Sequence, residues 1–341
     1  MDKIKLIVTP SATNLGNDIN AQLSGLISTK KTNLVANAEF VRFGNGEGKC
    51  VINDDLTGCD VYIISDVNNH GACYDYFGEQ HHMGPDEHLQ DIKRAISALR
   101  GQAARINVVM PLLYQSRQDK RKLAESLDCA MMLKELELYG VKNIITIDIH
   151  NAAVENAIPF SMYLHNQSML DELLDDFSAT EKWKNLFVVS PDSGASKKAD
   201  YCSKKLGVNK SGFFEKKRNY NVVKEGQNPI EYHEFNGPKD LTGYDILLVD
   251  DMIASGNSLF SSMKLLKKMN VNNIYLMTTF SLFTNGIECF EKAHKEKLFS
   301  KLYTTNTSYI PAEYQNRSFI HITNCSKTVA NTIYNLHLKT I

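Results

Sequence analysis

The sequence predicts an α/β protein built on mostly parallel β-sheets. Short, nearly uninterrupted runs of apolar, β-branched residues recur along the chain. This pattern is typical of strands that are buried on both faces of a parallel sheet. Each run ends in polar residues and is followed by a stretch whose apolar residues have helical spacing. The alternation of the two patterns indicates βαβ units.

Six apolar runs are expected to form strands: Val61–Ile64, Ile106–Met110, Ile144–Ile147, Leu186–Val189, Ile246–Val249 and Ile274–Met277. Three of the intervening stretches are expected to form helices, namely Leu89–Leu99, Asp128–Tyr139 and Ser258–Met269. The last two are followed by Gly140 and Asn270, residue types that commonly follow a helix C-terminus.

The length of 341 residues suggests two domains, at about 150 residues per domain. The expected strands fall into a first half that ends near His150 and a second half that begins near Asn151. We therefore expect two similar α/β domains, residues 1–152 and 153–341. The final strand and helix are a segment that can pack back on the first domain.

Composition excludes several classes of protein. Lys plus Arg number 38 and Asp plus Glu 39, so the net charge of −1 gives no global attraction to nucleic acid or to an anionic membrane. With 43% apolar and 23% charged residues, the chain is not collagen-like, disordered or a disulfide framework. The seven cysteines lack CxxC spacing and are expected to be reduced thiols. No apolar segment approaches the ~18 residues of a membrane span, so we expect a cytoplasmic protein.

Polar residues follow most of the expected strands, and they indicate where a site should lie. In open parallel sheets, ligands bind outside the carboxyl ends of the strands. The polar ends are Ser65-Asp66, Arg117-Gln118-Asp119 after Pro111, Asp148 with His150, Ser190-Pro191-Asp192, and Asp250-Asp251.

The segment Ile246–Ser258 has the sharpest functional pattern: a buried strand, two acids, a loop of small residues and a helix start. The free N–H groups at a helix N-terminus favour an anion, Ser255 and Ser258 add hydroxyl donors, and Gly256 permits close approach. Paired carboxylates suit ribose hydroxyls or a hydrated Mg²⁺. The alternative is an ordinary strand-to-helix turn with a serine cap and solvated aspartates.

This segment resembles the phosphoribosyl-diphosphate binding loop of type I phosphoribosyltransferase folds. Further blocks occur in the order found in ribose-phosphate diphosphokinases, also called phosphoribosyl-pyrophosphate synthetases: Phe43-Gly44-Asn45-Gly46-Glu47, Ser116–Lys120, Thr146–His150, Ser190–Gly194 and Glu215–Arg218. The resemblance covers about Val41 to Thr307. It implies two type I phosphoribosyltransferase-like domains, each with a central, mostly parallel sheet.

On the ATP side, the resemblance implies a role for three groups of residues. Phe43, Asn45 and Glu47 match adenine contacts that reach in from a neighbouring subunit. Arg117, Gln118 and Asp119 match the block that holds ATP. His150 and Asp192 match positions associated with the Mg²⁺ carried by ATP. Histidine is an untypical ligand for this hard cation, so a contact through water or to phosphate stays open for His150.

On the sugar side, Asp250 and Asp251 match the pair that binds the ribose hydroxyls and a second metal, and Ser255, Gly256, Asn257 and Ser258 match the loop around the 5-phosphate. Lys216 and Arg218 match the two cations of a mobile catalytic loop, which would continue through the turn-rich segments 219–221 and 225–229. Without the resemblance, the alternative for 216–218 is a solvated basic turn.

The implied reaction transfers the diphosphoryl group of ATP to the anomeric hydroxyl of ribose 5-phosphate, with Mg²⁺ as cofactor and AMP as the second product. Family likeness suggests a homo-oligomer, a hexamer built from dimers. Two alternatives remain: a phosphoribosyltransferase, and a non-catalytic regulatory paralogue in a mixed oligomer. The second is motivated by Ala254 and Asn257, which depart from the family's usual residues, an acid at the first position and glycine or alanine at the second.

Four histidines surround an apparent insertion relative to the family, Gly71 to Gly84: His70, His81, His82 and His88. Four histidines can bind a transition metal. Because they lack a fixed helical spacing, a solvated loop is the preferred interpretation.

Overall fold

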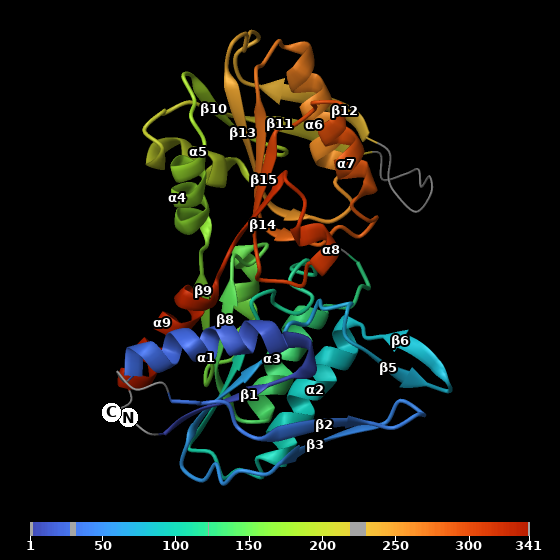
Figure 1. The fold of residues 1–341 in the computed structure, drawn as a ribbon, viewed down its shortest axis with the longest axis vertical. Coiled ribbons are helices and arrows are strands. Elements are labelled where there is room, and N and C mark those ends of the chain that lie inside the picture. Colours follow the sequence, from blue (N-terminus) through green and yellow to red (C-terminus); the bar gives the residue numbers. More distant parts are fainter. Residues whose placement is uncertain (1–2, 28–31, 122, 219–229, 340–341) are drawn as a thin grey trace. The chain divides into compact units, whose positions relative to one another are not determined.

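The computed structural model describes residues 3–27, 32–121, 123–218 and 230–339. For residues 216–218 and 230–233 it describes the backbone alone. The chain forms two compact units. The first comprises Met1–Met169, Asn306–Tyr309 and Asn324–Ile341, and the second Leu170–Thr305 and Ile310–Thr323. Each unit contains its own central sheet with helices around it (Figure 1). The predicted α/β class with two domains of this kind is confirmed.

The first unit is built on a five-stranded parallel sheet in the order β1-β4-β7-β8-β9. Its strands are β1 (Ile4–Val8), β4 (Asp60–Ile64), β7 (Arg105–Val109), β8 (Val141–Ile147) and β9 (Tyr163–Gln167). Every residue of β4 is buried, as expected for a central strand covered on both faces. The predicted strands at 61–64, 106–110 and 144–147 are thereby confirmed.

Helices cover both faces of this sheet. On one face, α2 (Pro85–Ala98) and α3 (Asp128–Leu138) share a core with alternate residues of the strands, such as Val61 and Ile63. The intervening Tyr62 points to the other face, where its hydroxyl donates to Ile333 O of α9 (Ser326–Leu338) at 3.4 Å. Helix α1 (Thr13–Ile27) lies beside α9. Two 3₁₀ segments, η1 (Pro10–Ala12) and η2 (Ala152–Ala157), complete the unit.

A buried ionic network fastens α9 to the sheet. Asp60 accepts hydrogen bonds from Arg105, from Asn107 Nδ2 at 2.7 Å and from His337 Nδ1 at 3.0 Å. Burial opposes the charged form, but the bonds from Arg105 and His337 hold the pKa of Asp60 below its usual value. The C-terminal helix therefore completes the first unit, although it is the last element in the sequence.

The first unit extends past the domain boundary expected after residue 152. Strand β9 pairs in parallel with β8 from Asn143↔Tyr163 to Ile147↔Gln167. The unit therefore continues to Met169 before the second unit begins at Leu170. Strand β16 (Ile320–Thr323) belongs to the second unit and α9 to the first.

The second unit has a seven-stranded sheet in the order β12-β11-β10-β13-β14-β15-β16, in which only β12 pairs antiparallel. Besides β16, its strands are β10 (Leu186–Ser190), β11 (Ser211–Arg218), β12 (Ile230–Asn236), β13 (Asp245–Ile253), β14 (Ile274–Ser281) and β15 (Lys301–Thr305). Its helices are α4 (Leu170–Thr180), α5 (Ser196–Lys205), α6 (Asn257–Lys268), α7 (Glu288–Lys295) and α8 (Ala312–Gln315).

The remaining predicted elements are also present. The strands expected at 186–189, 246–249 and 274–277 are β10, β13 and β14, and the three expected helices are α2, α3 and α6. Strand β13 continues beyond Val249 to Ile253, because Asp250, Met252 and Ile253 still pair with β14. The paired acids therefore lie within the strand and not after it.

The first unit also contains two small antiparallel hairpins, which are separate from its central sheet. One joins β2 (Ala38–Arg42) to β3 (Gly48–Ile52), and the other joins β5 (Cys73–Tyr76) to β6 (Glu79–His82). The second hairpin replaces the solvated loop expected around the histidines. Among the described residues, no three His, Cys, Asp or Glu side chains form a group that could hold a metal ion. None of the described helices has the length and hydrophobicity needed to span a membrane.

The carboxyl of Asp66, just after β4, is 5% exposed. Burial raises its pKa to about 7, although N–H groups of Asn68 and Tyr309 donate to it. The folded state therefore holds a proton on Asp66 between about pH 4 and pH 7, where the unfolded chain has lost it. Stability should fall as the pH rises through this window, by about 4 kcal/mol at most.

We predict that Asp66→Asn removes this pH dependence. The variant should be more stable than the wild type at pH 8, and the difference should shrink toward pH 5, where the wild-type carboxyl is protonated in the folded state. Denaturant unfolding of both proteins at the two pH values measures the effect. An equal difference at both values would contradict the assignment of the proton to Asp66.

Candidate active site

Three acids meet at one edge of the second sheet. Strands β10 and β13 run parallel and pair up to Val189↔Leu248, so Asp192 and Asp250 both follow the paired region at the carboxyl edge. The pKa of Asp250 lies well above its usual value, because the carboxyl is buried and the charges of Asp251 and Asp192 repel its own. The backbone N–H of Asp251 also donates to Asp250 Oδ1 at 2.9 Å. Burial and this repulsion therefore favour the protonated form of Asp250 when no ligand is bound.

The loop after β10 holds Asp192 in a defined position. Ser190 Oγ donates to the carbonyl oxygen of Asp192 at 2.8 Å, and the N–H of Ala195 donates to Asp192 Oδ1 at 3.1 Å. Because one carboxylate oxygen is engaged in this way, the turn into α5 fixes the orientation of the side chain. Its second oxygen is the one that such an arrangement offers to a ligand.

Helix α6 begins at a glycine that no other residue can replace without strain. Gly256 has φ +79°, and a Cβ atom there would lie 2.5 Å from Phe290 Cζ and 3.0 Å from Phe260 Cε2. The carbonyl of Gly256 accepts the first helical bond, from Phe260 N at 3.0 Å. The preceding N–H groups of the first turn lack intrahelical acceptors, as at any helix start, and they can bind an anion.

The other residues of the predicted phosphate loop surround this helix start. Ser255 and Ser258 are half-buried and Asn257 is exposed. The structure thus places Ser255, Gly256, Asn257 and Ser258 directly after the strand that carries Asp250 and Asp251. A phosphate at the helix N-terminus and a cation at the acids are compatible with one sugar phosphate bound along this loop.

Lys216 and Arg218 lie at the end of β11, not in a turn. Their backbone pairs with β12, from Lys216↔His233 to Arg218↔Ile230, with a register shift after Lys217. Strand β11 is parallel to β10, with Ser190↔Phe213 as the last pair, so both residues extend past the same carboxyl edge as Asp192. The segments 219–221 and 225–229, expected to continue the catalytic loop, lie outside the described residues.

In the first unit, the loops after β7 and β8 meet. Asp119 accepts a hydrogen bond from Asn151 Nδ2, which brings the Arg117-Gln118-Asp119 block to the residue that follows His150. Gln118 Oε1 also accepts from the N–H of Asp128, the first residue of α3, at 3.4 Å. Arg117 and His150 are exposed, so both side chains are accessible to a ligand.

The predicted adenine contacts lie at the tip of the β2–β3 hairpin. The tip is closed by backbone bonds from Phe43 N to Glu47 O and from Gly46 N to Phe43 O, both 2.8 Å. Asn45 Nδ2 donates to Glu47 Oε2 at 3.1 Å, and Phe43 is 46% exposed. The three side chains therefore stand together on one turn, where a ligand can reach them.

Two residues of these regions could not be identified from the sequence pattern. Asn151 marked only an expected domain boundary, although its position next to His150 could have drawn attention to it. Lys198 of α5 has a buried Nζ without a hydrogen-bond partner among the described residues. No sequence signal identified Lys198, because lysines on helices are normally exposed.

Comparisons with known proteins match two family models to successive parts of the chain. Residues 4–140 match the family model described as the N-terminal domain of ribose phosphate pyrophosphokinase, and residues 161–315 match the phosphoribosyl transferase domain. Together the two models cover most of the chain.

Curated relatives have low identity over long alignments. A ribose-phosphate pyrophosphokinase of Synechococcus elongatus is 26% identical over 300 residues, covering 87% of this chain and 82% of the relative. One of Vibrio cholerae is 28% identical over 255 residues, covering 74% of this chain and 73% of the relative. A crystal structure of phosphoribosylpyrophosphate synthetase from Mycobacterium smegmatis has a TM-score of 0.78 at 18% identity and covers 99% of each chain, which shows the same fold.

We predict that Gly256→Ala destabilises the protein by roughly 2–4 kcal/mol, since it combines a strained backbone with overpacking against Phe290. Gly243→Ala is the matched control: Gly243 has φ +78°, but a Cβ atom there would have no described atom within 4 Å. This variant should lower the free energy of unfolding by only about 1 kcal/mol, the contribution of the left-handed backbone conformation. Urea unfolding of both variants measures the difference. An equal decrease in the free energy of unfolding in both variants would show that Phe290 does not restrict position 256.

Proposed function

The chain belongs to the ribose-phosphate pyrophosphokinase family, and from this premise we propose that it transfers the β,γ-diphosphoryl group of ATP to the anomeric hydroxyl of ribose 5-phosphate. The observation that carries the proposal is the gathering of Asp192, Asp250 and Asp251 next to the N-terminus of α6. This edge of the second sheet is therefore the proposed site of the sugar phosphate and its metal.

The reaction moves one group between two oxygens. The anomeric oxygen of ribose 5-phosphate attacks the β-phosphorus of ATP, the bond from that phosphorus to the α,β-bridging oxygen breaks, and the anomeric hydroxyl loses its proton. AMP leaves with the bridging oxygen. Because charge accumulates on the transferred phosphoryl oxygens, cations and positioning supply most of the catalysis.

The sugar phosphate is held by the segment that joins β13 to α6. The first-turn N–H groups of α6, together with the hydroxyls of Ser255 and Ser258, bind the 5-phosphate. Asn257 adds a polar side chain at the same helix start. Asp250 and Asp251 accept hydrogen bonds from the ribose hydroxyls, which orients the sugar with its anomeric carbon toward the carboxyl edge.

The nucleotide is held by the first unit. Arg117 has a planar fork of donors that suits phosphate oxygens, and Gln118 and Asp119 belong to the same loop. The Phe43–Glu47 turn contacts adenine: Phe43 offers an aromatic face, and Asn45 and Glu47 offer hydrogen-bonding groups. The family resemblance assigns this turn to the active site of a second copy in a homo-oligomer, and its exposure is compatible with that assignment. A hexamer is the form that family likeness suggests.

Mg²⁺ is the cofactor that the donor set fits. Asp192 would offer a carboxylate oxygen to the Mg²⁺ carried by ATP, and Asp250 and Asp251 would offer theirs to a second metal, since Mg²⁺ commonly takes one or two carboxylates with waters and substrate phosphates. His150 is assigned to the metal carried by ATP, by direct or indirect contact. When bound, Mg²⁺ neutralises phosphate charge. The protein residues keep the acids together despite their repulsion, which prepares the site for that cation.

The alternatives are not favoured. A phosphoribosyltransferase would not account for the match of residues 4–140 to an N-terminal ribose phosphate pyrophosphokinase domain. The regulatory paralogue was motivated by Ala254 and Asn257. Asp250, Asp251 and Gly256 remain at the positions that bind ribose and shape the phosphate loop, so we retain the catalytic assignment.

We predict that the purified protein forms AMP from ATP when Mg²⁺ and ribose 5-phosphate are both present. Ribose without its phosphate should not support the reaction, because the α6 N-terminus then lacks its anion. Chromatographic quantification of AMP measures the activity. Failure to form AMP by well-folded protein over a range of phosphate concentrations would favour the regulatory paralogue.

We predict that Lys216→Ala lowers kcat by roughly 10²–10³-fold, since it removes a cation from the transferred group. The free energy of unfolding should change by less than about 0.5 kcal/mol. Lys239→Ala, which removes an exposed lysine of the same unit, is the control and should leave kcat unchanged. An unaltered kcat in Lys216→Ala would disprove the catalytic assignment of this residue.

A further inference from the structure

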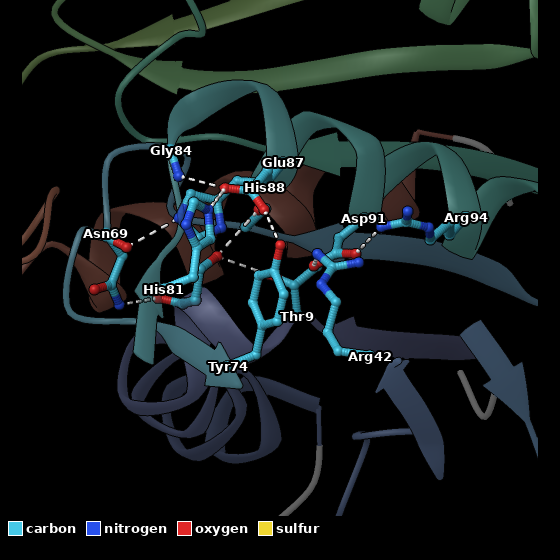
Figure 2. Close-up of polar contacts among 12 residues, drawn as sticks. Thr9, Arg42, Asn69, Tyr74, His81, Gly84, Glu87, His88, Asp91 and Arg94 are labelled. Carbon is cyan, nitrogen blue, oxygen red and sulfur yellow. Dashed lines mark hydrogen bonds and ion pairs between the residues drawn. The ribbon is translucent and has the colours of Figure 1, made fainter. Parts of the chain in front are cut away.

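The β5–β6 hairpin is the feature that the proposed function does not use. Its strands, Cys73–Tyr76 and Glu79–His82, are mostly exposed and contribute little to the core of the first unit. Yet two of its side chains, Tyr74 and His81, both contact the carboxylate of Glu87 on α2 (Figure 2). A surface hairpin that is attached to a helix in this way can hold a neighbouring segment in place.

The anchor is the carboxylate of Glu87 in the first turn of α2. Tyr74 Oη donates to Glu87 Oε1 at 2.9 Å, and His81 Nε2 lies 2.9 Å from Oε2. The N–H of Gly84 donates to the same Oε2 at 3.0 Å. These bonds outweigh partial burial and hold the pKa of Glu87 below its usual value, so the anchor is charged at neutral pH. Figure 2 shows the three donors converging on Glu87.

The tip of the hairpin lies against the β2–β3 turn. The N–H of Phe77 donates to Gly44 O at 2.8 Å. Gly46 has φ +87°, and a Cβ atom there would lie 3.0 Å from Tyr76 Cε2 and 3.4 Å from Tyr74 Oη. The backbone of the Phe43–Glu47 turn is therefore packed on the hairpin, and it needs a glycine to come so close.

Helix α2 supports both hairpins from one face. Asp91 lies one turn after Glu87 and accepts from Arg42 Nη2 at 2.8 Å, with both side chains largely buried. Arg42 is the last residue of β2, and its guanidinium carbon lies 5.4 Å from the centre of the Tyr74 ring. Glu87 thus fixes the β5–β6 hairpin and Asp91 fixes the β2–β3 hairpin, with Arg42 and Tyr74 in contact between them (Figure 2).

We propose that the Cys73–His82 hairpin is a positioning element that holds the Phe43–Glu47 turn in the conformation that binds the adenine base. This inference rests on the proposed function, because it takes Phe43, Asn45 and Glu47 as the base contacts. The hairpin acts through the backbone of the turn at Gly44 and Gly46, and it leaves the three base-binding side chains accessible. Its loss weakens nucleotide binding and spares the sugar phosphate site of the second unit.

The central test removes the hairpin. The N–H of Met83 donates to Ala72 O at 2.9 Å, so the ends of the segment already lie at the spacing of a tight turn. Replacing residues 73–82 by Asn-Gly should close the chain with a two-residue turn. We expect the KM for ATP to rise about tenfold, while the KM for ribose 5-phosphate and kcat at saturating ATP stay within about twofold.

A point substitution covers the case in which the deletion variant does not fold. Glu87→Gln weakens the three bonds to the anchor and should raise the KM for ATP about threefold without lowering kcat. Glu39→Gln is the matched control: Glu39 lies on β2, away from the turn, and accepts from Asn53 Nδ2 at 2.9 Å. It should leave all three kinetic constants unchanged. Calorimetric titration with ATP alone gives the same comparison without turnover.

The Phe43→Ala variant tests the assignment of the Phe43–Glu47 turn to the adenine base separately from the positioning role of the hairpin. A raised KM for ATP in Phe43→Ala, together with an unchanged KM in both hairpin variants, would overturn the positioning role alone. An unchanged KM in Phe43→Ala would overturn the assignment of the turn to the base, and the inference with it. Equal loss of ATP binding, ribose 5-phosphate binding and kcat in Glu87→Gln would show a general structural role instead.

Discussion

The parallel pairing of β10 with β13 is the constraint on which the candidate site depends. It brings Asp192 to the same sheet edge as Asp250 and Asp251, where their charges repel and burial adds to the cost of ionisation. An isolated strand would not keep these acids together. The central position of both strands in a seven-stranded sheet supplies the packing that opposes the repulsion.

The phosphate loop depends on a different constraint, the close approach of backbone to aromatic rings. Phe290 of α7 and Phe260 of α6 occupy the space that a side chain at position 256 would need. Glycine at this position therefore serves two purposes: it adopts a left-handed conformation, and it lets α6 start directly after the acidic strand. The proposed phosphate site is consequently continuous with the core of the second unit, in which Phe290 is fully buried.

The first unit uses its α2 helix in a comparable way, as a rigid base for exposed parts. Glu87 and Asp91, one turn apart, each hold a hairpin that has almost no core of its own. The unit itself is completed by α9, whose His337 contacts Asp60 on strand β4. These exposed turns are thus fixed by carboxylates of a neighbouring helix, since hairpins of this size cannot stabilise themselves.

The α/β class and the positions of the central strands could be predicted from the amino-acid pattern, because strands buried on both faces need uninterrupted apolar runs. The same pattern located the polar strand ends and the motif from Ile246 to Ser258. Which of these residues meet could be seen only once the elements were packed together. The bond between Asp119 and Asn151, the packing of Phe290 on Gly256, the return of α9 to Asp60 and the contact of the histidine-bearing hairpin with Gly44 join residues far apart in sequence or lacking any local pattern. Periodicity and turn propensity report on neighbours along the chain, and such contacts arise only when separate elements pack together.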